Sequence, residues 1–98
     1  MKKALLITAL LLSTPAAAIT EKQEVYCQVM MSMAEDIMKL RQIGEPIEAV
    51  RGVMSDIMSV AVTDAYEYPV FKSEEAAQQA IEFFSSRYGQ GCYKYAEE

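Results

Sequence analysis

Two cysteines, Cys27 and Cys92, stand sixty-five positions apart in this chain of 98 residues. In a small domain outside the cytosol, such a pair favours one disulfide bond. Closing a loop of this length stabilises the folded chain by about 4 kcal/mol in the chain-entropy model. Thioredoxin-like redox chemistry is the alternative, but it uses a close C-x-x-C pair that this sequence lacks. We therefore predict a structural Cys27–Cys92 bridge, which the fold has to bring together.

The N-terminus has the pattern of a cleavable signal peptide. Two lysines precede an apolar run, Ala4–Leu12, and a proline then leads into three alanines that end at Ala18. A membrane span needs about 20 apolar residues, so this run is too short to serve as an anchor. We expect cleavage near Ala18, which leaves residues 19–98 as one disulfide-stapled domain in the periplasm or outside the cell.

Helical periodicity begins directly after the leader. Thr20, followed three residues later by Gln23, is typical of a capping box. Apolar residues then recur at steps of three and four until Gly44, where glycine favours a helix end. We predict a first helix over residues 21–43. Its expected buried stripe consists of Tyr26, Val29, Met30, Met33, Ile37 and Leu40.

The middle of the chain allows two interpretations. Residues 46–67 keep helical spacing and would permit one helix, whereas Gly52 and Ser55 favour a break into two. Three long helices running up, down and up would leave the two cysteines at opposite ends of the bundle. A break near residues 52–55 adds one reversal and brings them together. We therefore predict an all-α bundle of four helical elements, the second one short, closed by one disulfide.

The last helix is expected to begin after Ser73, a good N-cap that precedes two glutamates. Its apolar stripe passes through Phe84 and continues toward Cys92. Gly89 and Gly91 weaken this continuation, because glycine inside a helix costs roughly 1 kcal/mol relative to alanine. We therefore expect the helix to end near Tyr88, with the tail held down by the disulfide.

Charge and composition exclude several classes of function. Nine lysines and arginines, two of them in the leader, stand against fourteen acids, so residues 19–98 carry a net charge of −7. Nucleic acid and anionic lipid attract clustered basic residues, and neither is an expected partner. The chain contains no histidine and no glycine-rich phosphate loop, which removes the usual general base and nucleotide sites. We therefore expect a protein that is not an enzyme.

Acidic residues are the remaining catalytic candidates. A glycosidase-like pair would have to come from Glu35, Asp36, Glu45 and Glu48. Three of these, Glu35, Glu45 and Glu48, fall on polar helix faces or in a connection, where acids mostly serve solubility. We interpret them as surface residues.

Methionine is unusually frequent in residues 19–98. Thioether clusters in exported proteins can hold copper(I), and a copper or small-ligand carrier is therefore an alternative function. Core packing is the simpler interpretation for Met30, Met33, Met54 and Met58, which lie on or beside the predicted stripes. Met31 and Met38, if exposed, would instead form part of a partner surface.

Tyrosines collect toward the end of the chain. Tyr93 and Tyr95 lie near a charged terminus and are candidates for a protein interface, since tyrosine is enriched at such contacts. Their alternative role is to cover the disulfide and the helix ends.

Two further segments carry a resemblance. Besides these segments, residues 41–46 (RQIGEP) and residues 65–71 (AYEYPVF), the resemblance includes the leader, the early Cys27 and an aromatic helix ending in Cys92. In these features the chain resembles a group of small exported helical two-cysteine proteins from bacterial and phage or prophage genomes. That group is uncharacterised, so no function follows from the resemblance. It marks Arg41, Tyr66 and Pro69 as positions to test.

The function predicted from the sequence is binding without turnover, as an exported accessory or inhibitor protein. Its partner is expected to be another protein, and the negative charge favours a basic one. No cofactor is expected. The predicted partner surface consists of Met31, Met38, Arg41, Tyr66, Tyr93 and Tyr95.

Overall fold

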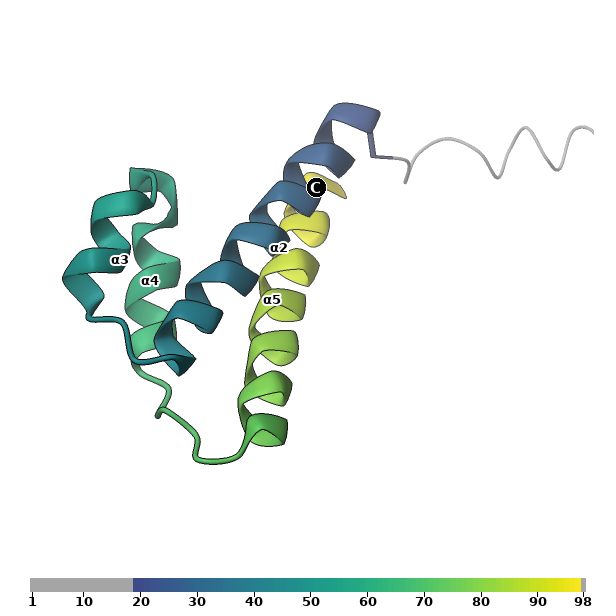
Figure 1. The fold of residues 1–98 in the computed structure, drawn as a ribbon. Helices are drawn as coiled ribbons and strands as arrows, with labels where there is room; N and C mark the ends of the chain where they lie inside the picture. Colours follow the sequence, from purple (N-terminus) through teal and green to yellow (C-terminus); the bar gives the residue numbers. More distant parts are fainter. Residues whose placement is uncertain (1–18, 98) are drawn as a thin grey trace, which may run out of the picture.

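The computed structural model describes residues 19–97, which form four α-helices and one 3-10 turn (Figure 1). The elements are α2 (Glu21–Gln42), α3 (Ile47–Val53), the turn η1 (Asp56–Met58), α4 (Ser59–Tyr66) and α5 (Glu74–Glu97). The predicted all-α fold with a short second element is confirmed. The signal peptide predicted over residues 1–18 lies outside the described residues.

Side-chain caps fix where the two long helices begin. The Thr20 hydroxyl accepts the Gln23 N–H at 3.0 Å, and the Gln23 side chain accepts the Thr20 N–H at 2.8 Å. At α5, the Ser73 hydroxyl accepts the Ala76 N–H at 3.1 Å. Helix α2 ends at Gln42, one residue earlier than predicted, and Gly44 follows with a φ of +90°. That left-handed conformation is the reason the turn needs glycine.

The break in the middle of the chain returns the cysteines to the same end of the molecule. Helix α3 ends at Val53, and Met54 and Ser55 are extended before η1 begins. The chain therefore reverses three times between α2 and α5 (Figure 1). Cys27 and Cys92 are disulfide-bonded, with their Cα atoms 5.5 Å apart. The predicted bridge, and the break it required, are both confirmed.

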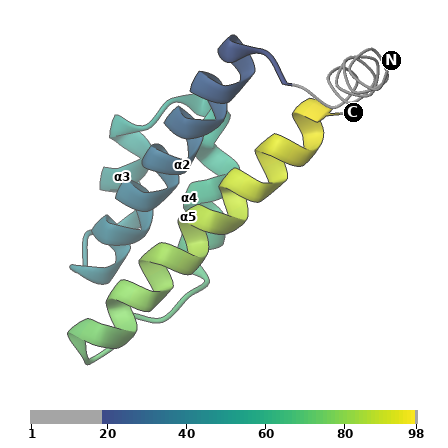
Figure 2. The ribbon, with the colours of Figure 1, turned by 90° about the vertical axis from the view of Figure 1, so that its right-hand side faces the viewer.

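The prediction that the last helix ends near Tyr88 is wrong, because α5 continues without interruption to Glu97. Packing explains why the two glycines do not stop it. Helices α2 and α5 lie side by side over a long distance (Figures 1 and 2), and the disulfide ties the last turns of α5 to α2. Gly89 is itself buried in this interface. Contacts with α2 thus offset the low helix propensity of glycine.

The core lies where α2, α4 and α5 converge. Its buried side chains are Ala34, Ile37, Met38, Val50, Met58, Ala61, Val62, Ala65, Ile81 and Phe84. Phe84 contacts two tyrosines, with its ring centroid 5.7 Å from that of Tyr68 and 4.9 Å from that of Tyr88. Helices α2 and α4 are in direct contact, and α3 covers α4 from the other side (Figure 1).

Unequal helix lengths leave part of the α2–α5 pair without a third neighbour. With 22 residues, α2 is roughly 33 Å long, whereas the eight residues of α4 span only about 12 Å. Tyr66 at the end of α4 lies against Arg41 near the end of α2, so α4 covers the later turns of α2. We call the remaining two-helix portion, residues 21–31 of α2 and 88–97 of α5, the arm.

No helix within residues 19–97 is both long enough and apolar enough to cross a membrane. The disulfide is consistent with an extracellular or periplasmic protein, because such bonds persist in oxidising compartments.

Candidate protein-binding groove

An apolar groove of about 370 Å³ opens between the two helices of the arm. Tyr26 and Met30, one turn apart on α2, form one wall. The other wall comes from α5 and consists of Tyr88, Gly91, Cys92 and Tyr95. All six residues are uncharged, so the groove is built for apolar contact.

The position of the groove follows from the length of α4. The apolar stripe of α2 runs from Met30 to Met33 and Ile37, and its later part packs in the core. Tyr26 lies on the same stripe beyond the reach of α4, and half of its surface is exposed. The groove is therefore the uncovered continuation of the face on which α4 packs.

Gly91 leaves one wall of the groove open. A Cβ atom added there would meet no heavy atom within 4 Å. Tyr95, one turn later on α5, is 81% exposed and borders the same space. A partner side chain could thus approach the α5 backbone beside an exposed aromatic ring.

Two further apolar side chains widen the exposed surface of α2. Val25 and Val29 are about half exposed, next in sequence to Tyr26 and Met30. Val29 and Tyr26 were predicted to be buried, and the structure corrects this, because α4 is too short to cover them. Sequence periodicity identified the stripe but not the part of it that has no neighbour.

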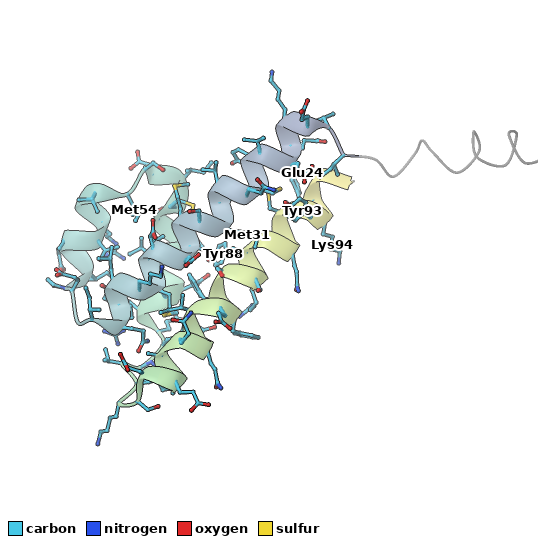
Figure 3. All side chains as sticks on the ribbon, turned by 45° about the vertical axis from the view of Figure 1, so that its right-hand side comes forward. Glu24, Met31, Met54, Tyr88, Tyr93 and Lys94 are labelled. Atoms are coloured by element: carbon cyan, nitrogen blue, oxygen red, sulfur yellow. A yellow bond between two sulfur atoms is a disulfide. The ribbon has the colours of Figure 1, made fainter. Side chains whose placement is uncertain are left out.

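Met31 and Met38 do not form the exposed patch proposed from the sequence. Met38 is fully buried in the core, and Met31 is partly buried between α2 and α5 (Figure 3). The thioether of Met31 lies against the backbone of Gly89. Both methionines therefore pack within the molecule, which removes them from the partner surface.

The other methionines also pack in or on the core. Met58 is buried, and Met30, Met33 and Met54 pack against the buried cluster as the sequence predicted. Residues 19–97 contain no group of three or more histidine, cysteine, aspartate or glutamate side chains placed to hold a metal ion. Packing gives the thioethers a role, and no observation in the described residues favours the copper alternative.

Arg41 and Tyr66 meet at the opposite end of the bundle from the groove. The Arg41 guanidinium carbon lies 4.8 Å from the centroid of the Tyr66 ring, and its Nε donates to the Tyr68 carbonyl at 2.9 Å. The Tyr66 hydroxyl donates to the Glu45 carbonyl. Burial raises the pKa of Tyr66, an effect that the nearby Arg41 opposes. These two candidate residues thus make contacts within the molecule, at the end of the bundle where α2 and α4 both end.

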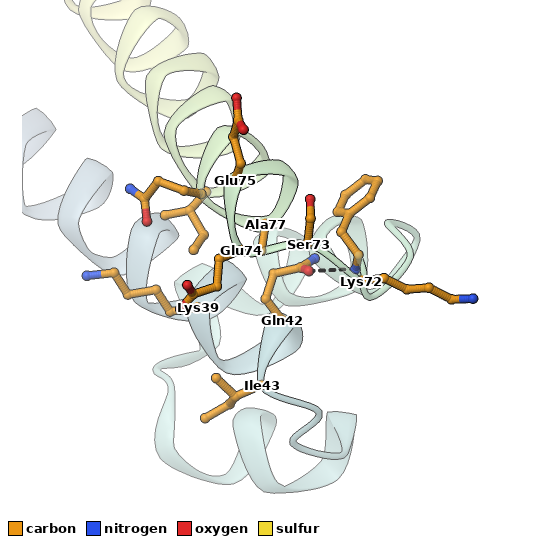
Figure 4. A pocket seen from close by; sticks show the side chains of 11 residues that line it. Lys39, Gln42, Ile43, Lys72, Ser73, Glu74, Glu75 and Ala77 are labelled. Atoms are coloured by element: carbon orange, nitrogen blue, oxygen red, sulfur yellow. Dashed lines mark hydrogen bonds between the residues drawn. The ribbon is translucent and has the colours of Figure 1, made fainter.

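Gln42 holds the loop that contains Pro69, the third position marked by the resemblance. Its side-chain amide donates to the Pro69 carbonyl at 2.8 Å. The same amide accepts the Phe71 N–H at 2.9 Å, the bond drawn as a dashed line in Figure 4. The Gln42 amide therefore both donates to and accepts from the loop backbone, as a peptide group of a neighbouring segment would. The two segments quoted from the sequence, residues 41–46 and 65–71, are in direct contact.

A second hollow, of about 620 Å³, lies beside this loop (Figure 4). Ile43, Phe71 and Ile81 contribute apolar surface, while Lys39 and Glu74 are among the charged side chains around it. Its lining mixes both charge signs with polar amides. This hollow has no single chemical character, so we regard the apolar groove as the stronger candidate site.

Tyr88 links the groove to the core through a partly buried polar contact. Its hydroxyl donates to the Asp64 carboxylate at 2.6 Å. Burial, and then the hydrogen bond to Asp64, raise the pKa of Tyr88 well above the ordinary tyrosine value. Asp64 and Tyr88 also line a small polar hollow of about 260 Å³ with Arg87 and Glu67. Tyr88 is thus fixed in position within the α5 wall of the groove.

The four candidate acids lie at or near the surface. Glu35 forms a salt bridge with Lys39 at 2.8 Å, and this hydrogen bond raises the pKa of Lys39. Glu48 is exposed in the first turn of α3, and Glu45 is exposed in the preceding turn. Asp36 is exposed on α2.

Tyr95 is the one predicted partner residue that the structure places at the groove. Tyr93 is half-buried on α5 near the disulfide, and Lys94 beside it points away from α2 (Figure 3). Tyr26, Met30 and Gly91 were not predicted as site residues. Their only signal in the sequence was a helical stripe that ran further than a short α4 could cover.

No family model, curated protein or solved structure matches this chain. The resemblance to exported two-cysteine proteins therefore stays a prediction from the sequence.

Proposed function

We propose that this is an exported protein that acts by binding another protein through the groove of its arm, as an accessory or inhibitor protein does. The observation that supports this most is the groove itself, since its uncharged lining includes the exposed rings of Tyr26 and Tyr95. Exposed tyrosines beside an apolar hollow are typical of protein interfaces.

Export belongs to the same proposal. Signal peptide cleavage near Ala18 would deliver residues 19–98 to the periplasm or the exterior, where the Cys27–Cys92 bond can form. The bond holds the two walls of the groove together, because Cys92 is itself one of the lining residues. An oxidising compartment is thus a condition for an intact groove.

The partner is proposed to carry net positive charge. Residues 19–98 have a net charge of −7, but the exposed charges on α2 near the groove include both Lys22 and Glu24. The negative field therefore acts on an approaching partner at long range and contributes little inside the groove. Added salt should slow association and leave dissociation nearly unchanged.

The test is capture of partners from a periplasmic extract by the disulfide-bonded protein and two matched variants. Gly91→Trp fills the groove, whereas Gly52→Trp places the same side chain on the exposed face of α3, where a Cβ also has open space. We expect a saturable partner to bind the wild type and Gly52→Trp, and to bind Gly91→Trp at least tenfold more weakly, a loss of about 1.4 kcal/mol. Equal capture by all three proteins, or no saturable capture, would contradict the proposal.

A further inference from the structure

The walls of the groove restrict the backbone of whatever fills it. Both walls are α-helices, α2 and α5, whose backbone N–H and C=O groups bond within their own helix. An extended segment in the groove would find no backbone partners on either side, and leaving buried peptide groups unpaired is costly. A helix satisfies its own backbone and needs only apolar contact. The occupant that suits these walls is therefore helical.

The spacing of the lining residues leads to the same conclusion. Tyr26 and Met30 are separated by one turn on α2, and Tyr88, Gly91 or Cys92, and Tyr95 follow at one-turn steps on α5. Side chains at these steps form ridges and grooves that accept the ridges of another helix. The same face of α2 already receives a helix, α4, immediately beyond the groove. The groove thus continues an existing helix-packing surface.

The contact at Gly89 shows how a side chain can pack against a glycine of α5, as we expect a partner side chain to do at Gly91. There, the Met31 side chain of α2 packs onto the α5 backbone because Gly89 has no side chain. Gly91 offers the same absence of a side chain on the groove side, with open space above it. A long unbranched apolar side chain such as methionine or leucine fits this arrangement.

We infer that the groove between Tyr26 and Tyr95 seats an amphipathic α-helix of a partner protein that carries net positive charge, with an apolar side chain of that helix against Gly91. This inference rests on the proposed function and adds the secondary structure of the bound element. The positive charge of the partner follows from the net charge of −7 on residues 19–98, which also disfavours a second copy of this equally acidic chain.

The experiment is a peptide selection on the disulfide-bonded protein recovered after export. The probe is a displayed library of random peptides about sixteen residues long, or roughly four helical turns. Peptides that also bind Gly91→Trp are removed. We expect the recovered sequences to show apolar residues at steps of three and four, and to become helical by circular dichroism on binding. Their affinity should fall at least about tenfold for Gly91→Trp, which is about 1.4 kcal/mol, and stay within about twofold for Gly52→Trp.

Two outcomes would overturn the inference. One is recovery of peptides without helical periodicity, or of none that distinguish Gly91→Trp. The other is a wild-type dimer in sedimentation that Gly91→Trp converts to a monomer, because a second copy would then occupy the groove. If partner capture still depends on Gly91 while the selected peptides are extended, the helical inference fails and the proposed function stands. If capture does not depend on Gly91, the proposed function fails as well.

Discussion

The Met31 side chain lies on the Gly89 backbone, at a point where α2 and α5 pass each other (Figure 3). A Cβ atom at Gly89 would overlap the Met31 thioether, whereas one at Gly91 would meet nothing within 4 Å. The two glycines are two residues apart in one helix, yet they face different surroundings. Gly89 makes room for the Met31 side chain of the same molecule, whereas Gly91 faces the groove.

This contrast predicts opposite effects of alanine at the two glycines. Gly89→Ala should lower the free energy of unfolding by about 1–2 kcal/mol, because Met31 has to leave its place. Gly91→Ala should raise it by up to about 1 kcal/mol through better helix propensity. Urea titration of the oxidised proteins measures both.

A double-mutant cycle provides the control for the Met31 contact. Combining Gly89→Ala with Met31→Ala should cost less than the sum of the two single changes, because the clash disappears. Effects of the same sign at both glycines, or simple additivity in the cycle, would contradict this account of the interface.

Removing the disulfide should destabilise the whole domain and loosen the arm most. Cys27→Ser with Cys92→Ser is expected to cost about 4 kcal/mol, since the bond closes a long loop. Apart from Tyr88 and Met30, which reach the core, the arm has only the α2–α5 contact to hold it, so hydrogen exchange should accelerate more over residues 21–31 and 88–97 than in α4. Uniform acceleration across all helices would argue against a separate arm.

Gln42 is predicted to contribute more to the stability of the fold than Gln78. Gln42→Ala leaves the Pro69 carbonyl and the Phe71 N–H without their partner, at a cost of about 1–2 kcal/mol. Gln78→Ala, on an exposed face of α5, is the matched control and should change stability by less than about 0.5 kcal/mol. Similar losses for both variants in thermal unfolding would show that the Gln42 contacts contribute little.

Alkaline pH should weaken the fold through Tyr88. The folded state holds the pKa of Tyr88 above the value of about 10 found in unfolded chains. As pH rises, the unfolded state therefore loses the Tyr88 proton before the folded state does. This contribution to stability is fully present below about pH 10 and is lost as pH rises toward the folded pKa.

The variant Tyr88→Phe should flatten the fall in stability above about pH 10. At neutral pH the same change should cost about 1 kcal/mol, because the hydrogen bond to Asp64 is lost. Tyr95→Phe changes an exposed ring and is the control. Urea titrations between neutral pH and about pH 11 would decide, and an unchanged slope in Tyr88→Phe would refute the role given to this tyrosine.

Local signals in the sequence predicted the helix starts well, because a cap depends on residues close in the chain. Thr20 and Ser73 both cap as expected. The end of α5 was mispredicted because Gly89 acts through Met31, a residue far away in sequence. Helix propensity alone carries no information about such a contact.

The candidate site was only partly predictable for a related reason. Tyr95 was identified by its position near the terminus, while Tyr26 and Met30 were assigned to a buried stripe. Whether a stripe is covered depends on how far α4 reaches, and that is set by the break near Ser55 and the contact of Tyr66 with Arg41. Periodicity indicates which residues share a face but not what lies opposite them.

The Cys27–Cys92 bond also has a practical consequence for anyone who purifies this protein. It brings residues 19 and 97 to the same tip as the groove (Figure 2). An affinity tag fused to either terminus would therefore crowd the opening and could mask binding. A single attachment point at position 72, which is exposed at the far end, would instead immobilise the molecule with the groove facing outward.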